Sequence, residues 1–265
     1  MTEESKTSLQ DFIQDRLQLM QYCFTKKVAI TQTGLSDAAF RMAASRLRKK
    51  SKLISPYRGF YVALPPQYQR RGVPPATLFV DELMNYVGKP YYVGLLTAAS
   101  MFGAAHHAPQ EFQVLVPDQM NEIRIKNLRV SFVYNSYLND TSTTERTTET
   151  GEITVSTPEF TALDLVHYDE RSGHLDNVAT VLGDLAEVLD PQGLLEAAKD
   201  YHSMASVQRL GYILNFLGEE KLISSLLDWV RGQELSRVPL STLNSRSGER
   251  DKKWEIIINK QLRPD

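Results

Sequence analysis

Cysteine is nearly absent from this sequence, in which Cys23 is the one occurrence among 265 residues. A single thiol cannot close an internal disulfide and cannot supply the ligand set of a zinc site, so we expect a reducing, intracellular environment. The sequence also has no apolar run long enough to span a bilayer. Its polar, acidic start, MTEESKTSLQDF, is unlike a signal peptide. These absences favour a cytoplasmic protein without a membrane partner.

The common motifs of catalysis and nucleotide binding are also missing. There is no GxxxxGK[ST], no GxGxxG and no GxSxG pattern in the chain. His106 and His107 form the one adjacent histidine pair, and Glu111 is the nearest acid, which leaves too few ligands in register for a metal. We therefore expect no enzymatic activity, no metal ion and no cofactor.

Basic residues are concentrated in one short segment. Between Phe24 and Gly72 the chain has eleven lysines and arginines and one acid, a net charge of +10. Residues 1–23 carry −2 and residues 73–265 carry −10, so the overall charge of −2 conceals the asymmetry. Positive charge confined in this way is typical of a module that binds a polyanion. A basic surface that is merely solvated is the alternative.

Periodicity and capping residues predict three helices at the N-terminus. The first covers residues 8–20, with Ser8 as its cap and an apolar face formed by Leu9, Phe12, Ile13, Leu17 and Met20. A short helix over about 25–31 follows, and then a turn. Ser36 is a good N-cap for a third helix that runs to about residue 50.

The third predicted helix has two chemically different faces. At about 100° per residue, its core-facing side is formed by Phe40, Ala43, Ala44 and Leu47. The opposite side is formed by Arg41, Ser45, Arg48, Lys49 and, if the helix continues, Lys52. A thin apolar edge with a broad basic edge suits a helix that enters the major groove of DNA.

A β-hairpin is predicted directly after this helix. Leu53-Ile54 and Phe60-Tyr61-Val62 are strand-like, and the turn between them carries Arg58. Helix, helix-turn-helix and hairpin in this order predict a winged helix-turn-helix domain. The residues expected to contact DNA are Lys26, Lys27, Arg41, Ser45, Arg46, Arg48, Lys49, Lys52 and Arg58.

The rest of the chain predicts a second, larger domain. Pro65-Pro66 and Pro74-Pro75 bracket a linker-like stretch, which places the boundary near residue 72 and gives domains 1–72 and 73–265. Strand and helix patterns mix as far as about residue 176, and residues 139–150 form a polar, threonine-rich segment that we expect to be an exposed loop. Helices predominate from residue 177 onward. The predicted fold class is α+β, with an N-terminal winged helix-turn-helix followed by a larger mixed α/β C-terminal domain whose second half is helical.

Four segments in this order carry a resemblance to a known family. They are the hairpin RGFYVALPP (58–66), the stretch YYVGLLTAASMFGAAHHAPQEFQVLV (91–116), the strand and helix ITVSTPEFTALDLV (153–166), and SVQRLGYILNFLG (206–218). Together they resemble the AbiEi family of antitoxins, over roughly residues 24–220. Residues 232–265 have no clear counterpart.

The resemblance implies a specific function. Such a protein would bind operator DNA through its winged helix, repress its own operon and counteract a nucleotidyltransferase-like toxin, with or without binding that toxin directly. The alternatives are an orphan winged-helix regulator, a protein-interaction module without antitoxin activity, and an enzyme whose C-terminal domain acts on a nucleotide or on the toxin. The net charge of +10 in residues 24–72 argues against a pure protein-interaction module, and no motif supports the enzyme.

Overall fold

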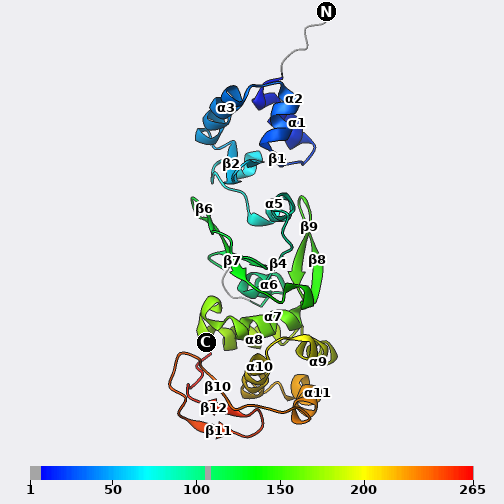
Figure 1. The fold of residues 1–265 in the computed structure, drawn as a ribbon, viewed down its shortest axis with the longest axis vertical. Helices are drawn as coiled ribbons and strands as arrows, with labels where there is room; N and C mark the ends of the chain where they lie inside the picture. The colour runs from blue at the N-terminus through cyan, green and yellow to red at the C-terminus, as the bar shows by residue number, and fades with distance from the viewer. Residues whose placement is uncertain (1–6, 105–108, 265) are drawn as a thin grey trace, which may run out of the picture. The chain divides into compact units, whose positions relative to one another are not determined.

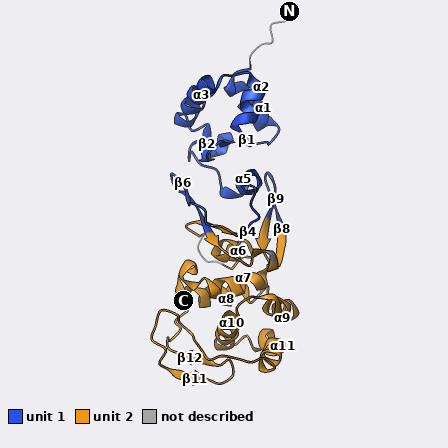
Figure 2. Cartoon of the chain, viewed as in Figure 1, with its two compact units in different colours: residues 1–91, 119–132, 145–153 blue, residues 92–118, 133–144, 154–265 orange. Residues whose placement is uncertain are grey.

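The structure is a computed structural model that describes residues 7–104 and 109–264. The chain forms two compact units, each assembled from separate stretches of sequence (Figure 2). Unit 1 contains Met1–Tyr91, Gln119–Phe132 and Glu145–Ile153, and unit 2 contains Tyr92–Asp118, Val133–Thr144 and Thr154–Asp265. The expected boundary at residue 72 stays a prediction, because compact units and independently folding domains need not coincide.

The three helices predicted at the N-terminus are present. They are α1 (Leu9–Gln18), α2 (Lys26–Thr33) and α3 (Asp37–Lys49), labelled in Figure 1. Ser8 accepts a hydrogen bond from the backbone N–H of Asp11 at 3.1 Å, and Ser36 accepts one from Ala39 at 3.2 Å. These side chains satisfy N–H groups that have no partner within the helix. Because α1 ends at Gln18, Met20 lies beyond it and is 52% exposed, so its expected place on the apolar face is wrong.

Aromatic rings form the centre of this small helical region. Phe12 and Phe24 meet edge to face with ring centres 5.1 Å apart, and Phe40 and Tyr61 do the same at 5.2 Å. Leu47 of α3 is buried in the same cluster. Edge-to-face pairs add about 0.5–1.5 kcal/mol each to the hydrophobic gain of burying the rings. The apolar edge of α3 is therefore anchored, which leaves its basic edge outward.

A three-stranded antiparallel sheet completes the N-terminal region. Its strands are β1 (Cys23–Thr25), β2 (Leu53–Tyr57) and β3 (Phe60–Ala63), in the order β1-β3-β2. The hairpin β2–β3 was predicted, whereas the short strand β1 was not. Gly59 in the turn has φ +81°, a conformation that glycine adopts without strain. This helix-and-sheet region fits the predicted winged helix-turn-helix.

The proline-rich stretch after the hairpin is packed rather than open. It contains a short helix, α4 (Pro66–Gln69), and Val73 behind it is buried. A 3₁₀ turn (Ala76–Leu78) and helix α5 (Val80–Val87) continue unit 1. The polypeptide therefore has no long flexible linker at the expected position.

A six-stranded sheet has the order β6-β7-β5-β4-β9-β8. Its strands are β4 (Tyr92–Val93), β5 (Phe112–Val116), β6 (Ile123–Ile125), β7 (Leu128–Tyr134), β8 (Thr143–Thr148) and β9 (Gly151–Ser156). The expected loop at 139–150 is thus wrong, because half of this segment is strand β8. Threonine favours strands, but with polar residues on both faces this strand has no apolar alternation that sequence reading could detect.

The remaining helices lie in unit 2, and they predominate between residues 177 and 231 as expected. They are α6 (Leu95–Met101), α7 (Pro158–His167), α8 (His174–Leu185), α9 (Pro191–Asp200), α10 (Met204–Phe216) and α11 (Glu220–Arg231), with a 3₁₀ turn at Asp169–Ser172. Thr157 caps α7 by accepting a hydrogen bond from the backbone N–H of Phe160. Among the described residues, none of the helices is long and apolar enough to cross a membrane.

The C-terminal residues form a small sheet on the helical core. It contains β10 (Val238–Pro239), β11 (Glu249–Asp251) and β12 (Ile256–Ile258) in the order β10-β12-β11. The strand-like sequence WEIII (254–258) forms a strand only over its last three residues. Trp254 is fully buried and lies against Gly211 of α10, where a Cβ atom would come within 2.2 Å of the indole ring. Gly211 is needed for this close approach.

A buried carboxylate ties three elements of unit 2 together. Asp164 of α7 accepts hydrogen bonds from Tyr92 Oη at 2.8 Å and from Tyr201 Oη at 2.9 Å, and Asn135 donates to Tyr92 Oη. Burial raises the pKa of Asp164 to about 7, against the two tyrosine hydrogen bonds, which favour the charged form. The simplest role for this network is structural, because it satisfies polar groups inside an apolar core.

Candidate nucleic-acid interface

The two faces of α3 are those that its sequence predicted. Phe40, Ala44 and Leu47 are buried. The expected DNA-contacting residues Arg41, Ser45, Arg46, Arg48 and Lys49 are all exposed on this helix. Arg41, Ser45, Arg48 and Lys49 fall within about 100° of arc on the helical wheel, and Arg46 lies about 60° beyond Lys49. The structure thus brings five of the nine expected residues together on one helix.

The other four expected residues lie on flanking segments of unit 1. Lys27 at the start of α2 is exposed, and Lys26 beside it is half-buried. Lys52 is half-buried just after α3, and Arg58 is exposed at the tip of the hairpin β2–β3. No side chain of the nine is enclosed in the core, so each can reach solvent or a ligand.

One exposed residue on the basic face was missed by sequence reasoning. Met42 is 59% exposed and falls on the helical wheel between Lys49 and Arg46. A methionine there is an apolar group on a charged surface, and such a group can contact the methyl of thymine. Its position could have been read from the same 100° spacing that placed the arginines.

The single acid of the basic segment is engaged with two of its cations. Asp37, in the first turn of α3, forms ion pairs with Lys26 of α2 and with Arg41 one turn along α3. The hydrogen bonds from Lys26 and Arg41 hold the pKa of Asp37 below its ordinary value. Two of the nine expected DNA-contacting residues therefore already have an anionic partner within the protein.

The hairpin β2–β3 is held in place by α5. Tyr86 of α5 donates a hydrogen bond from its hydroxyl to the backbone carbonyl of Arg58 at 3.2 Å, and its ring lies 5.5 Å from that of Phe60. The Tyr86 hydroxyl also lies where a side chain at Gly59 would begin, 2.6 Å from an ideal Cβ. These contacts fix the tip, so Arg58 projects from a braced turn.

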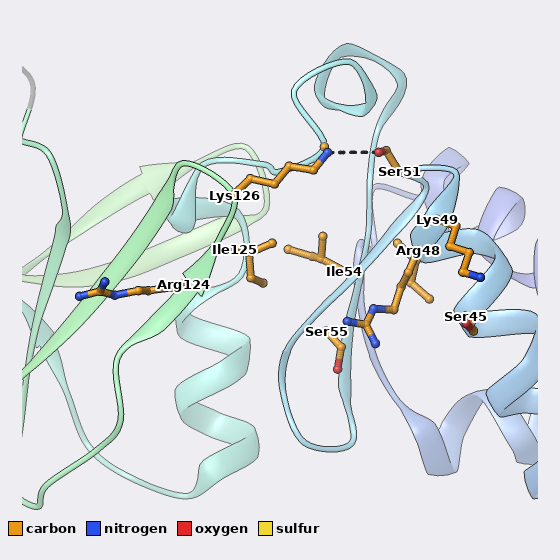
Figure 3. Close-up of a pocket in the computed structure, with 11 residues that line it drawn as sticks. Ser45, Arg48, Lys49, Ser51, Ile54, Ser55, Arg124, Ile125 and Lys126 are labelled. Carbon is orange, nitrogen blue, oxygen red and sulfur yellow. Dashed lines mark hydrogen bonds between the residues drawn. The ribbon is translucent and has the colours of Figure 1, made fainter.

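A pocket lies between α3, β2 and strand β6 with the turn that follows it, and all of its lining residues belong to unit 1 (Figure 3). It has a volume of about 550 Å³ and is lined by Ser45, Arg48, Lys49, Ser51, Leu53, Ile54, Ser55, Gly72, Arg124, Ile125 and Lys126. Arg124 and Lys126 were not among the expected site residues. No sequence signal could identify them, because they are about 75 residues from the helix that they approach.

The remaining titratable groups provide little for chemistry. Cys23 is buried, and burial raises the pKa of its thiol, as expected for an inert core cysteine. His167 hydrogen-bonds Ser206, and burial lowers the pKa of this imidazole to about 4. In the described part of the chain, no three His, Cys, Asp or Glu side chains are grouped to hold a metal. The pair His106-His107 lies outside the described residues.

The fold and the charged surface place this chain among α+β proteins in which a small, basic helix-and-sheet region precedes a larger part of mixed helices and strands. Residues 92–216, slightly less than half of the chain, match the model of the AbiEi antitoxin C-terminal domain. The match confirms the family resemblance and supports an antitoxin role in a toxin–antitoxin system. AbiEi antitoxins are not known as enzymes.

A solved structure shares the fold across nearly the whole chain. The crystal structure of the RV2827C protein from Mycobacterium tuberculosis aligns with a TM-score of 0.66 at 16% identity, covering 92% of this chain and 89% of that one. At this identity the likeness concerns the fold alone. No curated protein matches the sequence.

Proposed function

We propose that the chain is the antitoxin of an AbiE-like toxin–antitoxin pair and the repressor of its own operon. In this proposal residues 1–72 act as a winged helix-turn-helix that binds operator DNA, and the protein counteracts a nucleotidyltransferase-like toxin. The observation that carries the DNA-binding part is the exposed basic face of α3, anchored from behind by Phe40 and Leu47. The family match of residues 92–216 carries the antitoxin part.

The side chains of α3 suit the two kinds of contact that a DNA reader makes. Arginine can bond both O6 and N7 of guanine, and Arg41 and Arg48 project from the outer face of the helix. Met42 offers an apolar contact beside them. Lys27 of α2 and Arg58 in the turn of the hairpin are exposed and would neutralise phosphates, which fixes orientation without reading sequence. Together these groups form one helix-and-wing interface.

Binding measurements on a variant of α3 test the DNA-binding part. Fluorescence anisotropy would compare the duplex upstream of this gene with an unrelated duplex across a salt series. A bidentate contact between arginine and guanine is worth about 1–3 kcal/mol. We therefore expect Arg41→Ala with Arg48→Ala to weaken binding to the upstream duplex about 30-fold or more (about 1 kcal/mol or more for each of two contacts), and the loss of two positive charges to flatten the salt dependence.

A matched control tests whether the loss of affinity depends on this face of α3 or only on the net charge of the protein. Lys199→Ala with Lys221→Ala removes the same two charges from exposed helix positions of unit 2. We expect wild-type affinity and salt dependence from this control. If the α3 variant binds as tightly as the control, the assignment of α3 to DNA is wrong.

Protection from the toxin tests the antitoxin part independently. A neighbouring nucleotidyltransferase-like gene expressed alone should arrest growth. Co-expression of this chain with that gene should permit growth. The Arg41→Ala, Arg48→Ala variant should lose repression of a promoter fusion but keep protection, because its changes lie outside residues 92–216. Loss of both properties in a folded variant would contradict the division of roles.

A further inference from the structure

The pocket beside α3 combines an apolar floor with a rim of cations and hydroxyls. Leu53, Ile54 and Ile125 contribute apolar surface, and Figure 3 shows the hairpin residues Arg124 and Lys126 across from Arg48 and Lys49. Ser45, Ser51 and Ser55 add hydroxyl groups to the lining. Such a rim offers charged and neutral hydrogen-bond donors to a single anionic group.

Lys126 is held at this pocket by neutral groups. Its ammonium donates to Ser51 Oγ at 3.3 Å (Figure 3) and to the backbone carbonyl of Arg71 at 3.4 Å. Within the described residues it has no carboxylate partner. An ammonium has three N–H donors, so one donor and the full charge of Lys126 stay available to an anion.

The backbone is shaped to admit this ammonium. Gly72 is buried with φ +72°, and a Cβ atom there would lie 1.8 Å from Lys126 Nζ. Lys126 itself has φ +53°, which is uncommon for a residue with a side chain. Two unusual backbone positions therefore meet at one cation, although they are 54 residues apart in the chain.

Positive charge around the pocket is incompletely balanced. Arg124 pairs with Glu122 at 2.7 Å, and Glu122 also accepts from Arg129. In the part of the chain that the structure describes, Arg48 and Lys49 form no ion pair. Three like charges, from Arg48, Lys49 and Lys126, thus line one concave surface, and a bound anion would relieve their mutual repulsion.

We propose that this pocket binds backbone phosphates of duplex DNA, so that the turn of hairpin β6–β7 forms a third element of the DNA interface beside α3 and the wing. The proposal rests on the proposed function. Arg48 and Lys49 line the pocket and also belong to the outer face of α3, so the two surfaces are continuous. This continuity favours DNA over a small phosphorylated molecule as the source of the phosphate.

Neutralising Lys126 in the full-length protein tests this inference. Lys126→Gln should weaken binding about eightfold at 0.1 M salt and lower the salt slope by about 1. The loss should be equal for the upstream duplex and an unrelated duplex, because a phosphate contact reads no bases. Lys126→Arg, which keeps the charge, and Lys199→Gln, which removes a charge from unit 2, should both retain wild-type affinity and slope.

The outcomes separate this inference from the proposed function. If Arg41→Ala with Arg48→Ala abolishes binding while Lys126→Gln changes nothing, the pocket is not part of the interface and the proposed function stands. If the wild type binds neither duplex, both the proposed DNA-binding function and the assignment of the pocket to DNA are wrong. Titration with inorganic phosphate and with ATP covers the small-molecule source. Binding of either that Lys126→Gln removes, with DNA affinity unchanged, would overturn the assignment of the pocket to DNA.

Discussion

Asp37 is the most informative single residue for the DNA-binding hypothesis. It is the one acid between Phe24 and Gly72, and it pairs with Lys26 and Arg41, two of the expected DNA-contacting residues. A phosphate that approached either cation would compete with this carboxylate. We therefore predict that Asp37→Asn, which removes the negative charge with little change in side-chain size, strengthens DNA binding by releasing these cations.

The size of the effect follows from the number of cations released. If one of the two gains a phosphate, affinity should rise about eightfold at 0.1 M salt, and if both do, about 60-fold, with the salt slope steeper by about 1 or 2. The substitution has a cost, since an acid in the first turn of a helix stabilises it by about 0.3–1 kcal/mol. We thus expect tighter binding from a protein that melts at a slightly lower temperature.

Anisotropy across a salt series, with calorimetry of the free protein, would measure both quantities. Asp15→Asn is the control, because it makes the same charge change at an exposed position of α1, where Asp15 forms no ion pair with the residues that the structure describes. Equal gains from Asp15→Asn would mean that net charge alone acts. Weaker binding by Asp37→Asn would mean that Asp37 orients Arg41 for DNA rather than competing with it, and would refute the reasoning.

Two further predictions concern unit 2. The folded-state pKa of Asp164, about 7, exceeds its ordinary value of 3.8, so the protonated carboxyl stabilises the folded protein. This contribution to the free energy of unfolding, about 4 kcal/mol, is complete below about pH 4 and is lost as the pH rises through 7. Asp164→Asn should remove this part of the pH dependence in urea unfolding between about pH 4 and pH 8, and an unchanged profile would show that the carboxyl does not titrate there. Gly211→Ala should lower the free energy of unfolding by about 1–3 kcal/mol through its clash with Trp254, whereas Gly183→Ala, with open space around it in α8, should raise it by about 0.5–1 kcal/mol. The opposite order of urea midpoints would contradict this packing argument.

Features that depend on neighbouring residues were predictable from the sequence. The caps Ser8, Ser36 and Thr157, the core face of α3 and the hairpin after it all follow from interactions within a few residues. The concentration of basic charge before residue 73 needs only counting. These signals placed the helices of the candidate site and put four of its side chains, Arg41, Ser45, Arg48 and Lys49, on one exposed face of α3.

Features that join distant segments required the tertiary structure. Glu149, in a segment expected to be a loop, accepts hydrogen bonds from Tyr22 at 2.9 Å and Tyr68 at 3.2 Å, contacts that no local pattern encodes. The pairing of strands depends on the packing of the whole unit, and polar strands show no apolar period. The arginines of α3 could be placed on an outer face from sequence alone, because the periodicity of a helix is local. Only the fold could bring Lys126 to that helix and set Asp37 against Lys26.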